Sequence, residues 1–285
     1  MHLPRLQLFE FNDAPFAPKA LQRTIVSALS RTLRWGRMLD GLVPPFLAFL
    51  EASGAREVLD IASGAGEPAA LLLEALAQGG HTPPTCTLTD LHPHLEAWRA
   101  LVERHPTTLA FVPEPVDATQ LPPDLGRGRA RVIINAFHHF PPTLAQRVLV
   151  GMARDAPGVF LAEGLVRDPR SFLAMTPWGL PALVAEPLLA PEGRLASAAL
   201  AWLSPVAVLA SAWDGTVSTL RCYSRDELFH FAEAVGPGWR WEYGTYPVGR
   251  FGRGSWFFGV PVTSNDRAST PPAPSPARSG AAPRR

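Results

Sequence analysis

The chain has 285 residues, of which 47% are hydrophobic and 18% charged, and its formal net charge is +1. This length suits one large domain or a core with a subdomain, and the composition excludes a chain that is disordered overall. A charge so near zero gives no strong attraction to nucleic acid, so we expect no nucleic-acid partner. Cys86 and Cys222 lack metal-spaced partners, which favours buried thiols in a reducing compartment. No signal-peptide apolar segment opens the sequence, and we expect a cytoplasmic protein.

The first part of the chain is expected to form an arm and a helical cover ahead of the core. Prolines and phenylalanines in 1–16 indicate an extended arm that packs aromatic side chains onto the domain. Residues 17–51 predict two helices, broken near Gly41 and Pro44-Pro45, with an apolar stripe at near-helical spacing. These helices would cover a cofactor or pack against a sheet edge, and the sequence leaves both interpretations open.

The chain is organised around residues 57–68, which predict a strand, a small-residue turn and the start of a helix. The apolar segment 58–61 suits a buried strand, and the small side chains of 63–66 leave the backbone open to a ligand. Pro68 fits the first turn of a helix. Strand and helix patterns then alternate, so 52–167 predicts a parallel sheet with helices on both faces.

Two ligands compete for this turn. Gly64 to Ala69 matches G-x-G-x-x-A, a fingerprint of dinucleotide sites that hold a pyrophosphate. Glycine turns of this kind are common, so the match alone is weak. Asp60, four positions before Gly64, favours a different ligand, because a carboxylate there would repel a pyrophosphate and attract an ammonium group.

The pattern Asp60-x-Ala62-x-Gly64-x-Gly66 resembles the first motif of the class I S-adenosylmethionine (SAM)-dependent methyltransferases, acidic-x-Gly-x-Gly-x-Gly, with Ala62 in place of the first glycine. The resemblance implies SAM as the cofactor, with Asp60 holding the methionine ammonium. It also implies a Rossmann-like α/β fold: a doubly wound, mostly parallel seven-stranded sheet with an antiparallel C-terminal hairpin, an N-terminal helical cover and an apolar helical insert. The residues whose backbone would floor the site are Ala62, Ser63, Gly64 and Gly66.

A second acidic residue ends the next predicted strand, which runs from Cys86 to Thr89. The carboxylate of Asp90 could accept both ribose hydroxyls of a nucleoside. It could instead cap a helix over 92–104. The resemblance favours ribose binding and also places Leu91 against the cofactor.

A third acidic residue, Asp117, follows a predicted strand that begins at Phe111. Taken alone, Asp-Ala-Thr is an ordinary turn signal. The resemblance implies that Asp117 binds the adenine amino group and that the backbone of Ala118 reads the ring nitrogen. The weight of this assignment comes from its place as third acidic residue in order, after Asp60 and Asp90.

The fourth predicted strand, 131–134, is followed by Asn135-Ala-Phe-His138-His139-Phe-Pro, at the edge where parallel sheets collect their chemistry. The pattern Asn-x-x-His-His-Phe-Pro resembles the fourth motif of many small-molecule methyltransferases, so Asn135 would border the cofactor and acceptor. His138 or His139 could deprotonate an acceptor hydroxyl, or both could have structural roles. The fifth predicted strand ends at Glu163, which could be a second base, a substrate anchor or a cap for the following turn.

Residues 168–222 interrupt the alternation, and two runs without charge, 172–185 and 195–213, form their apolar part. The second run has about the length that spans a bilayer, but Pro205 lies near its middle and no cluster of positive charge flanks it. A buried lid over the cofactor, a lid with peripheral membrane contact through 172–213, and true insertion stay open as alternatives. An apolar wall there favours a small hydrophobic acceptor.

The sequence after the insert predicts a return to the core. Asp214-Gly215 predicts a turn. Ser224 and Glu227 form a capping box and therefore predict the start of a helix.

The core is expected to be completed over 223–262. Trp239–Val248 and Ser255–Val262 predict the two strands of the closing hairpin, with a bend between them. Residues 263–285 are rich in Pro, Ser, Ala and Arg and predict a disordered tail.

Together these features predict an enzyme, a SAM-dependent methyltransferase that moves a methyl group to an oxygen, nitrogen or carbon atom of a small, apolar acceptor. The main alternative is a SAM-binding protein without catalysis that docks on a membrane or a partner through its apolar insert. An NAD-dependent oxidoreductase is less favoured, because Lys19 is the only lysine and no Tyr-x-x-x-Lys pair can exist. No metal is expected.

Overall fold

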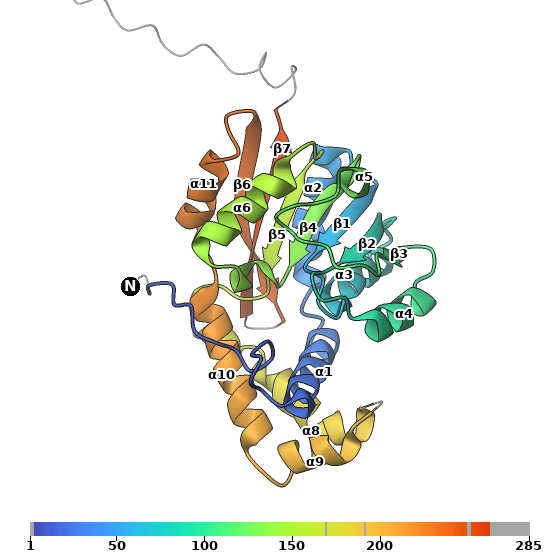
Figure 1. The fold of residues 1–285 in the computed structure, drawn as a ribbon, viewed down its shortest axis with the longest axis vertical. Coiled ribbons are helices and arrows are strands. Elements are labelled where there is room, and N and C mark those ends of the chain that lie inside the picture. Colours follow the sequence, from blue (N-terminus) through green and yellow to red (C-terminus); the bar gives the residue numbers. More distant parts are fainter. Residues whose placement is uncertain (1–2, 169, 191, 250–251, 263–285) are drawn as a thin grey trace, which may run out of the picture.

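The structure is a computed structural model that describes residues 3–168, 170–190, 192–249 and 252–262. Its centre is a seven-stranded sheet in the order β3-β2-β1-β4-β5-β7-β6 (Figure 1). Strands β1 to β5 pair in parallel, and β7 and β6 follow as an antiparallel hairpin. The strands are β1 Glu57–Ile61, β2 Thr85–Thr89, β3 Leu109–Phe111, β4 Ala130–Ile134, β5 Val159–Glu163, β6 Trp239–Val248 and β7 Gly252–Pro261. This topology confirms the predicted Rossmann-like fold class.

Helices cover both faces of the sheet (Figure 1). One face packs against α2, α3 and α4, and the other against α6 and α11. The bounds are α2 Val43–Ser53, α3 Glu67–Gln78, α4 Leu95–Arg104, α6 Pro142–Ala153 and α11 Arg225–Glu233, with short turns at η1 Asp40–Leu42, α5 Pro123–Gly126 and η2 Phe137–His139. The predicted capping box is present at the start of α11, where Ser224 and Glu227 each bond the other's backbone N–H.

Strand β1 shows why the sheet is apolar on both sides. Val58 packs in the cluster beneath α2, α3 and α4, whereas Leu59 and Ile61 pack in the cluster beneath α6 and α11. Successive side chains of a strand point to opposite faces, so a strand covered on both faces needs apolar residues at nearly every position. Asp60 departs from this pattern, although it is only 3% exposed.

A second group of helices lies beyond the carboxyl ends of the parallel strands, in the lower part of Figure 1. We call this group the helical lobe; it consists of α1 Lys19–Trp35, α7 Arg170–Leu173, α8 Thr176–Leu189, α9 Arg194–Ala201 and α10 Val206–Arg221. A small apolar core joins α1 to α8 and α10 through Leu21, Ile25, Ala28, Leu183, Ala207 and Ala210. The insert therefore packs with the N-terminal helix above the strand ends where chemistry was expected.

The uncharged run near Pro205 forms two helices, not one. Pro205 stands at the N-cap of α10, and the axes of α9 and α10 differ by 79°. No single helix among the described residues is both long and apolar enough to cross a bilayer, whereas this bent pair meets the length and composition requirement when its two helices are taken together.

The turn predicted at Asp214-Gly215 is wrong, because both residues lie inside α10. The Asp214 carboxylate accepts hydrogen bonds from the backbone N–H groups of Phe11 at 2.6 Å and Asn12 at 3.0 Å, so its polar group is satisfied by the arm instead of by a turn. Gly215 leaves the space that the Phe172 ring occupies, since a Cβ would lie 1.9 Å from that ring.

Other boundaries differ by a few residues. Helix α4 begins at Leu95, three positions later than predicted, and β3 already begins at Leu109. The second strand of the hairpin begins at Gly252, three residues earlier than predicted. Pro44 and Pro45 lie in the first turn of α2, where proline is tolerated, and so they start that helix. The predicted disordered tail, 263–285, lies outside the described residues.

Candidate functional site

The turn between β1 and α3 has the backbone that its glycines predict. Gly64 has φ +51° and Gly66 has φ +81°, a left-handed conformation that favours glycine. A Cβ on Gly66 would lie 2.7 Å from Leu101 and 2.8 Å from Leu88, whereas a Cβ on Gly64 would meet nothing within 4 Å. Gly66 therefore permits close packing beneath the turn, and Gly64 leaves the backbone accessible from outside.

Two residues other than glycine share this left-handed conformation at neighbouring strand ends. Ala62 follows β1 with φ +56°, and Asn135 follows β4 with φ +59°. Alanine is disfavoured in this region, and asparagine tolerates it better. Strained backbone of this kind gathers at functional sites. Ala62, which stands in place of the first glycine of the motif, therefore adopts a backbone conformation that favours glycine.

Asp60 is a buried carboxylate beside this turn. Ser63 and Thr89 donate their hydroxyls to the backbone oxygen of Asp60 at 3.0 and 2.8 Å, which fixes the end of β1. The pKa of the Asp60 carboxyl is raised to about 7, chiefly by burial; this value includes a lowering by a hydrogen bond from Ser63 and a rise from the nearby charge of Asp90. No positively charged group contributes to this shift. A cation placed here would favour the ionised form of Asp60.

Asp90 holds the glycine turn against the end of β2. Its Oδ2 accepts the backbone N–H of Gly64 at 2.8 Å, and its Oδ1 accepts that of His92 at 2.8 Å. The alternative role as a helix cap is wrong, because the N-cap of α4 is His94 and has no side-chain cap. Each carboxylate oxygen can accept a second hydrogen bond, so Asp90 retains capacity for a hydroxyl ligand.

Asp117 and its neighbours lie beside Asp90, because the backbone N–H of Val116 donates to the Asp90 carbonyl at 2.8 Å. The exposed Asp117 carboxylate accepts both the backbone N–H and the hydroxyl of Thr119, at 2.8 and 2.7 Å. These bonds lower the pKa of Asp117 and show the turn that Asp-Ala-Thr predicts. Ala118 is half-buried and Leu91 is exposed at the same edge.

Trp98 is a residue of this region that sequence reasoning missed. Its indole N–H donates to the carbonyl of Gly64 at 2.8 Å, and its ring is fully buried against Phe111. The signal was present in the amphipathic pattern of α4, which points Trp98 and Leu101 inward. Trp98 therefore supports the turn from below.

At the next strand end, Asn135 joins β4 to β5. Its backbone N–H donates to the Ala162 carbonyl at 2.8 Å, and its side-chain Oδ1 accepts the N–H of Gly164 at 2.6 Å. Asn135 thus fixes the loop that carries the two histidines relative to the loop after Glu163.

His138 and Glu163 form a buried pair. Glu163 Oε2 lies 2.8 Å from His138 Nδ1, and Glu163 Oε1 accepts the backbone N–H of His138 at 2.9 Å. A carboxylate partner favours the tautomer with the proton on Nδ1, which leaves a lone pair on Nε2. This Nε2 is buried and makes no hydrogen bond within the described residues. The structure thus brings together two of the predicted catalytic residues and shows Glu163 orienting His138.

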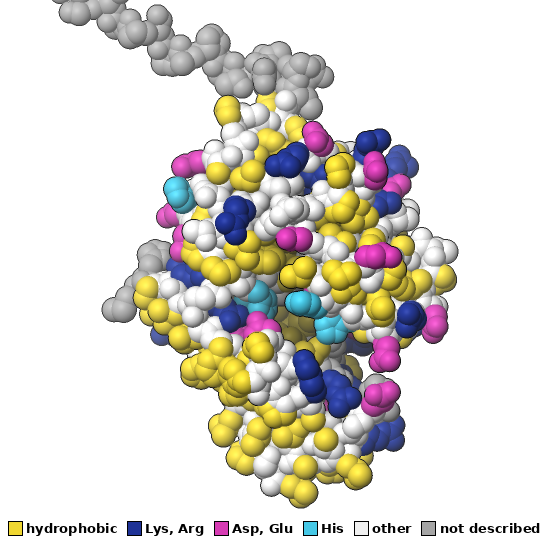
Figure 2. All heavy atoms as spheres, in the orientation of Figure 1, with side chains coloured by type: hydrophobic (Ala, Val, Ile, Leu, Met, Phe, Trp, Pro, Cys, Tyr) yellow, Lys and Arg dark blue, Asp and Glu magenta, His cyan; other side chains and the backbone are white. Residues whose placement is uncertain are grey.

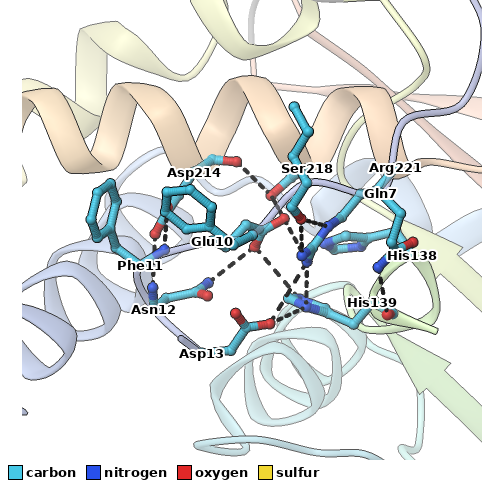
Figure 3. A network of polar contacts seen from close by, with 12 residues as sticks. Gln7, Glu10, Phe11, Asn12, Asp13, His138, His139, Asp214, Ser218 and Arg221 are labelled. Atoms are coloured by element: carbon cyan, nitrogen blue, oxygen red, sulfur yellow. Dashed lines mark hydrogen bonds and ion pairs between the residues drawn. The ribbon is translucent and has the colours of Figure 1, made fainter. Parts of the chain in front are cut away.

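His139 points into a different set of contacts (Figure 3). Its Nδ1 lies 3.1 Å from Asp13 Oδ2 and 3.1 Å from an Arg221 guanidinium nitrogen. Its Nε2 lies 3.9 Å from Glu10 Oε2. The rings of His138 and His139 are 4.2 Å apart, so the two imidazoles border one region.

The arm brings charged residues to this region that the sequence did not reveal. Glu10 is fully buried, and its Oε1 lies 3.0 Å from Arg221. Arg5 donates to the carbonyls of His138 and Phe140, both at 3.0 Å. The predicted aromatic packing of the arm is also present, through contacts among Phe9, Phe11, Phe16 and Trp213. The one sequence feature that could have indicated this role of Glu10 is its position between Phe9 and Phe11.

Figure 2 shows a hollow between the sheet and the helical lobe, with histidine side chains along its rim. The loops after β1 and β4 come from neighbouring strands of the sheet. Strand β1 itself carries the buried carboxylate of Asp60, and the loop after β4 carries His138, whose Nε2 makes no hydrogen bond within the described residues. The arrangement therefore suits a ligand with a positive group at one end and an acceptor group near the histidines.

No family model matches the chain, and no curated protein sequence matches it. Among solved structures, magnesium protoporphyrin IX methyltransferase from Synechocystis PCC 6803 with bound SAH is 17% identical, with a TM-score of 0.46, over 81% of this chain and 86% of that one. An O-methyltransferase family protein from Burkholderia thailandensis is 16% identical, with a TM-score of 0.43, over 82% and 60%. The pyocyanin biosynthetic protein PhzM is 14% identical, with a TM-score of 0.49, over 81% and 56%. With TM-scores below 0.5, these likenesses assign no function to this chain.

Proposed function

We propose that this chain is a SAM-dependent methyltransferase that acts on a small acceptor. The observation that carries the proposal is the buried carboxylate of Asp60 beside an accessible glycine turn, with Asp90 as the second acidic group. Two carboxylates attract the ammonium of an amino-acid ligand and repel the pyrophosphate of a dinucleotide. SAM fits because it carries an ammonium group, ribose hydroxyls and an adenine, for which Asp60, Asp90 and Asp117 stand in order.

The acceptor would be held near His138. When bound, SAM supplies a methyl group on a sulfonium. The acceptor oxygen forms its new bond to that methyl carbon while the carbon–sulfur bond breaks, and His138 Nε2 takes the proton of the acceptor hydroxyl. Glu163 keeps the imidazole in the required tautomer and stabilises the imidazolium. Transfer to oxygen is thus the reaction that the free Nε2 supports best.

The test compares ligands on the purified chain. SAM and its demethylated product SAH are expected to raise the melting temperature, and NAD is expected to leave it unchanged. Asp90→Ala should abolish the SAM shift, whereas Asp124→Ala, at a carboxylate 95% exposed on α5, should retain it. A larger shift with NAD than with SAM would contradict the proposal. Isotopically labelled SAM incubated with a cell extract would then trace the acceptor.

We also propose that the protein is cytoplasmic and that its helical lobe makes a peripheral contact with a lipid surface, from which an apolar acceptor could enter. Leu195, in the first turn of α9, is 88% exposed, and Leu203, two residues after the end of α9, is 83% exposed. Trp178 and Trp202 are also about half exposed. Figure 2 shows apolar side chains gathered over this end of the molecule. Tryptophans together with protruding leucines are typical of helices that lie in a membrane interface.

A further inference from the structure

We propose that Glu10, His138 and His139 form a binding site for one divalent transition-metal ion of the Zn²⁺ type. Each of the three residues offers a ligand atom within 4.8 Å of the others. They come from the arm and from η2, which are far apart in the sequence and meet beside α10 (Figure 3). The site is additional to the proposed SAM site and does not depend on it.

The first argument is the state of the two imidazoles. Nδ1 of His138 is bound by Glu163 at 2.8 Å, and Nδ1 of His139 is near Asp13 at 3.1 Å. Histidines that bind metals almost always donate their other ring N–H to a carboxylate or carbonyl. His138 therefore has the orienting partner of a metal ligand and keeps Nε2 available. His139 Nδ1 also lies 3.1 Å from an Arg221 nitrogen, and in the tautomer that donates to Asp13 it too keeps Nε2 available.

The second argument is independent of the first. His138 is 6% exposed, and its Nε2 makes no hydrogen bond within the described residues. A buried polar atom without a partner is costly and calls for an explanation. A metal ion bound to the Nε2 lone pair would satisfy it.

The third argument concerns charge. Glu10 uses Oε1 to pair with Arg221 at 3.0 Å, which leaves Oε2 toward His139 Nε2 at 3.9 Å. Glu10 is fully buried, and the carboxylate of Asp13 also lies 3.7 Å from the same Arg221 guanidinium, so two carboxylates share one arginine. Arg221 thus balances part of the negative charge, and a divalent cation would balance the rest.

The donor set decides the class of ion. Two imidazole nitrogens and one carboxylate suit Zn²⁺ and its first-row neighbours, whereas Mg²⁺ and Ca²⁺ prefer oxygen ligands. Three protein ligands also leave a coordination position open. The ion would occupy the Nε2 lone pair that His138 uses as a base, so metal binding and base catalysis exclude each other. Binding is therefore measured without SAM or acceptor.

The experiment uses the full chain after treatment with a chelator. Titration calorimetry with ZnCl₂ is expected to show one ion per chain. His139→Gln should weaken the affinity at least about tenfold, and Asp13→Asn, which removes the carboxylate behind His139, should weaken it about 10- to 100-fold. His230→Gln is the matched control, because His230 is exposed and lies 3.2 Å from Glu233 on α11; its affinity should equal that of the unmodified chain.

His139 is half-buried, so its variant is expected to fold; an unchanged circular dichroism spectrum and a cooperative thermal unfolding transition of the ligand-free chain check this. Co²⁺ provides a second readout, since its visible absorption should appear in the chain and be lost in His139→Gln. Absence of saturable Zn²⁺ binding by the unmodified chain would overturn the proposal. An unchanged affinity or Co²⁺ spectrum in His139→Gln would overturn it as well, because the ion would then bind elsewhere.

Discussion

Asp60 is the residue in which stability and ligand binding oppose each other. Burial raises its pKa from 3.8 to about 7 in the folded chain. One pKa unit corresponds to about 1.4 kcal/mol, so keeping this carboxylate ionised destabilises the folded state by a few kcal/mol. A bound ammonium group would recover part of that free energy, which is why a buried acid here indicates a cationic ligand.

A pH dependence follows for Asp60. The pKa of Asp60 is higher in the folded than in the unfolded chain. Protonated Asp60 therefore contributes its full stability below about pH 4, and this contribution is lost as the pH rises through about 7. Asp60→Asn should therefore raise the melting temperature at pH 8 and change it little at pH 4, while removing the SAM shift. The exposed Asp226→Asn should show no such pattern. A melting difference that is equal at both pH values would contradict the expectation.

His138 supports a second prediction at this scale. His138→Gln should lower the rate of methyl transfer by about 10²- to 10⁴-fold, because the proton of the acceptor loses its base. The SAM-induced melting shift should be retained, since His138 does not contact the glycine turn. Rates come from single turnovers with labelled SAM and the traced acceptor. The exposed His81→Gln should keep the full rate; an unchanged rate in His138→Gln would remove the base role.

Among the elements, the β1–α3 turn gives a matched pair of substitutions. Gly66→Ala should destabilise the fold by about 2 kcal/mol or more, because φ is +81° and the new Cβ would lie within 3 Å of Leu88 and Leu101. Gly64→Ala should cost only about 1 kcal/mol, since its surroundings are open, but should weaken SAM binding. Gly54→Ala, with φ +64° and open surroundings, is the control that leaves SAM binding intact.

Denaturant unfolding and SAM-induced melting shifts measure the two effects separately. Equal stability losses at Gly64 and Gly66 would show that packing beneath the turn does not matter. An unaffected SAM shift in Gly64→Ala would place the ligand away from this backbone.

Local patterns predicted most elements of the core, because each β-strand and helix there carries its own periodicity and end signals. Helix α3 was expected at about 67–78 and spans Glu67–Gln78, since Gly66, Pro68 and Gly79 mark both ends. The turn at Asp214-Gly215 failed because its outcome depends on Phe11 and Phe172, which local sequence cannot show. The secondary structure at such positions depends on residues that are distant in the sequence.

The candidate site likewise contains residues that local sequence predicted and residues that only the tertiary structure reveals. Asp60, Asp90 and the glycines were identified because they lie in or just after the last residues of strands that meet at one edge of a parallel sheet. Their roles toward SAM, and the division of the chain into domains, stay predictions. The pairing of His138 with Glu163 was not predicted as a pair, and the contribution of Glu10 was missed, because the arm reaches η2 only through tertiary contacts.

For the whole molecule, the helical lobe predicts lipid binding. The chain should co-sediment with phosphatidylcholine vesicles, and Leu195→Ser with Leu203→Ser should reduce the bound fraction several-fold, because both side chains protrude. Leu91→Ser is the matched control, since Leu91 is 52% exposed in the loop after β2 and is not part of the helical lobe. Absence of co-sedimentation, or equal loss in the control, would contradict the contact.

The hydrogen bonds between the arm and α10 also determine the order in which the fold can assemble. The N–H of Leu6 meets the carbonyl of Leu220, and the N–H of Phe11 meets Asp214, more than 200 residues later. During synthesis the arm leaves the ribosome before α10, so more than 200 further residues must emerge before the helix that it contacts is available. The contacts around His138 and His139 can thus be completed only after strands β1 to β5 have been synthesised.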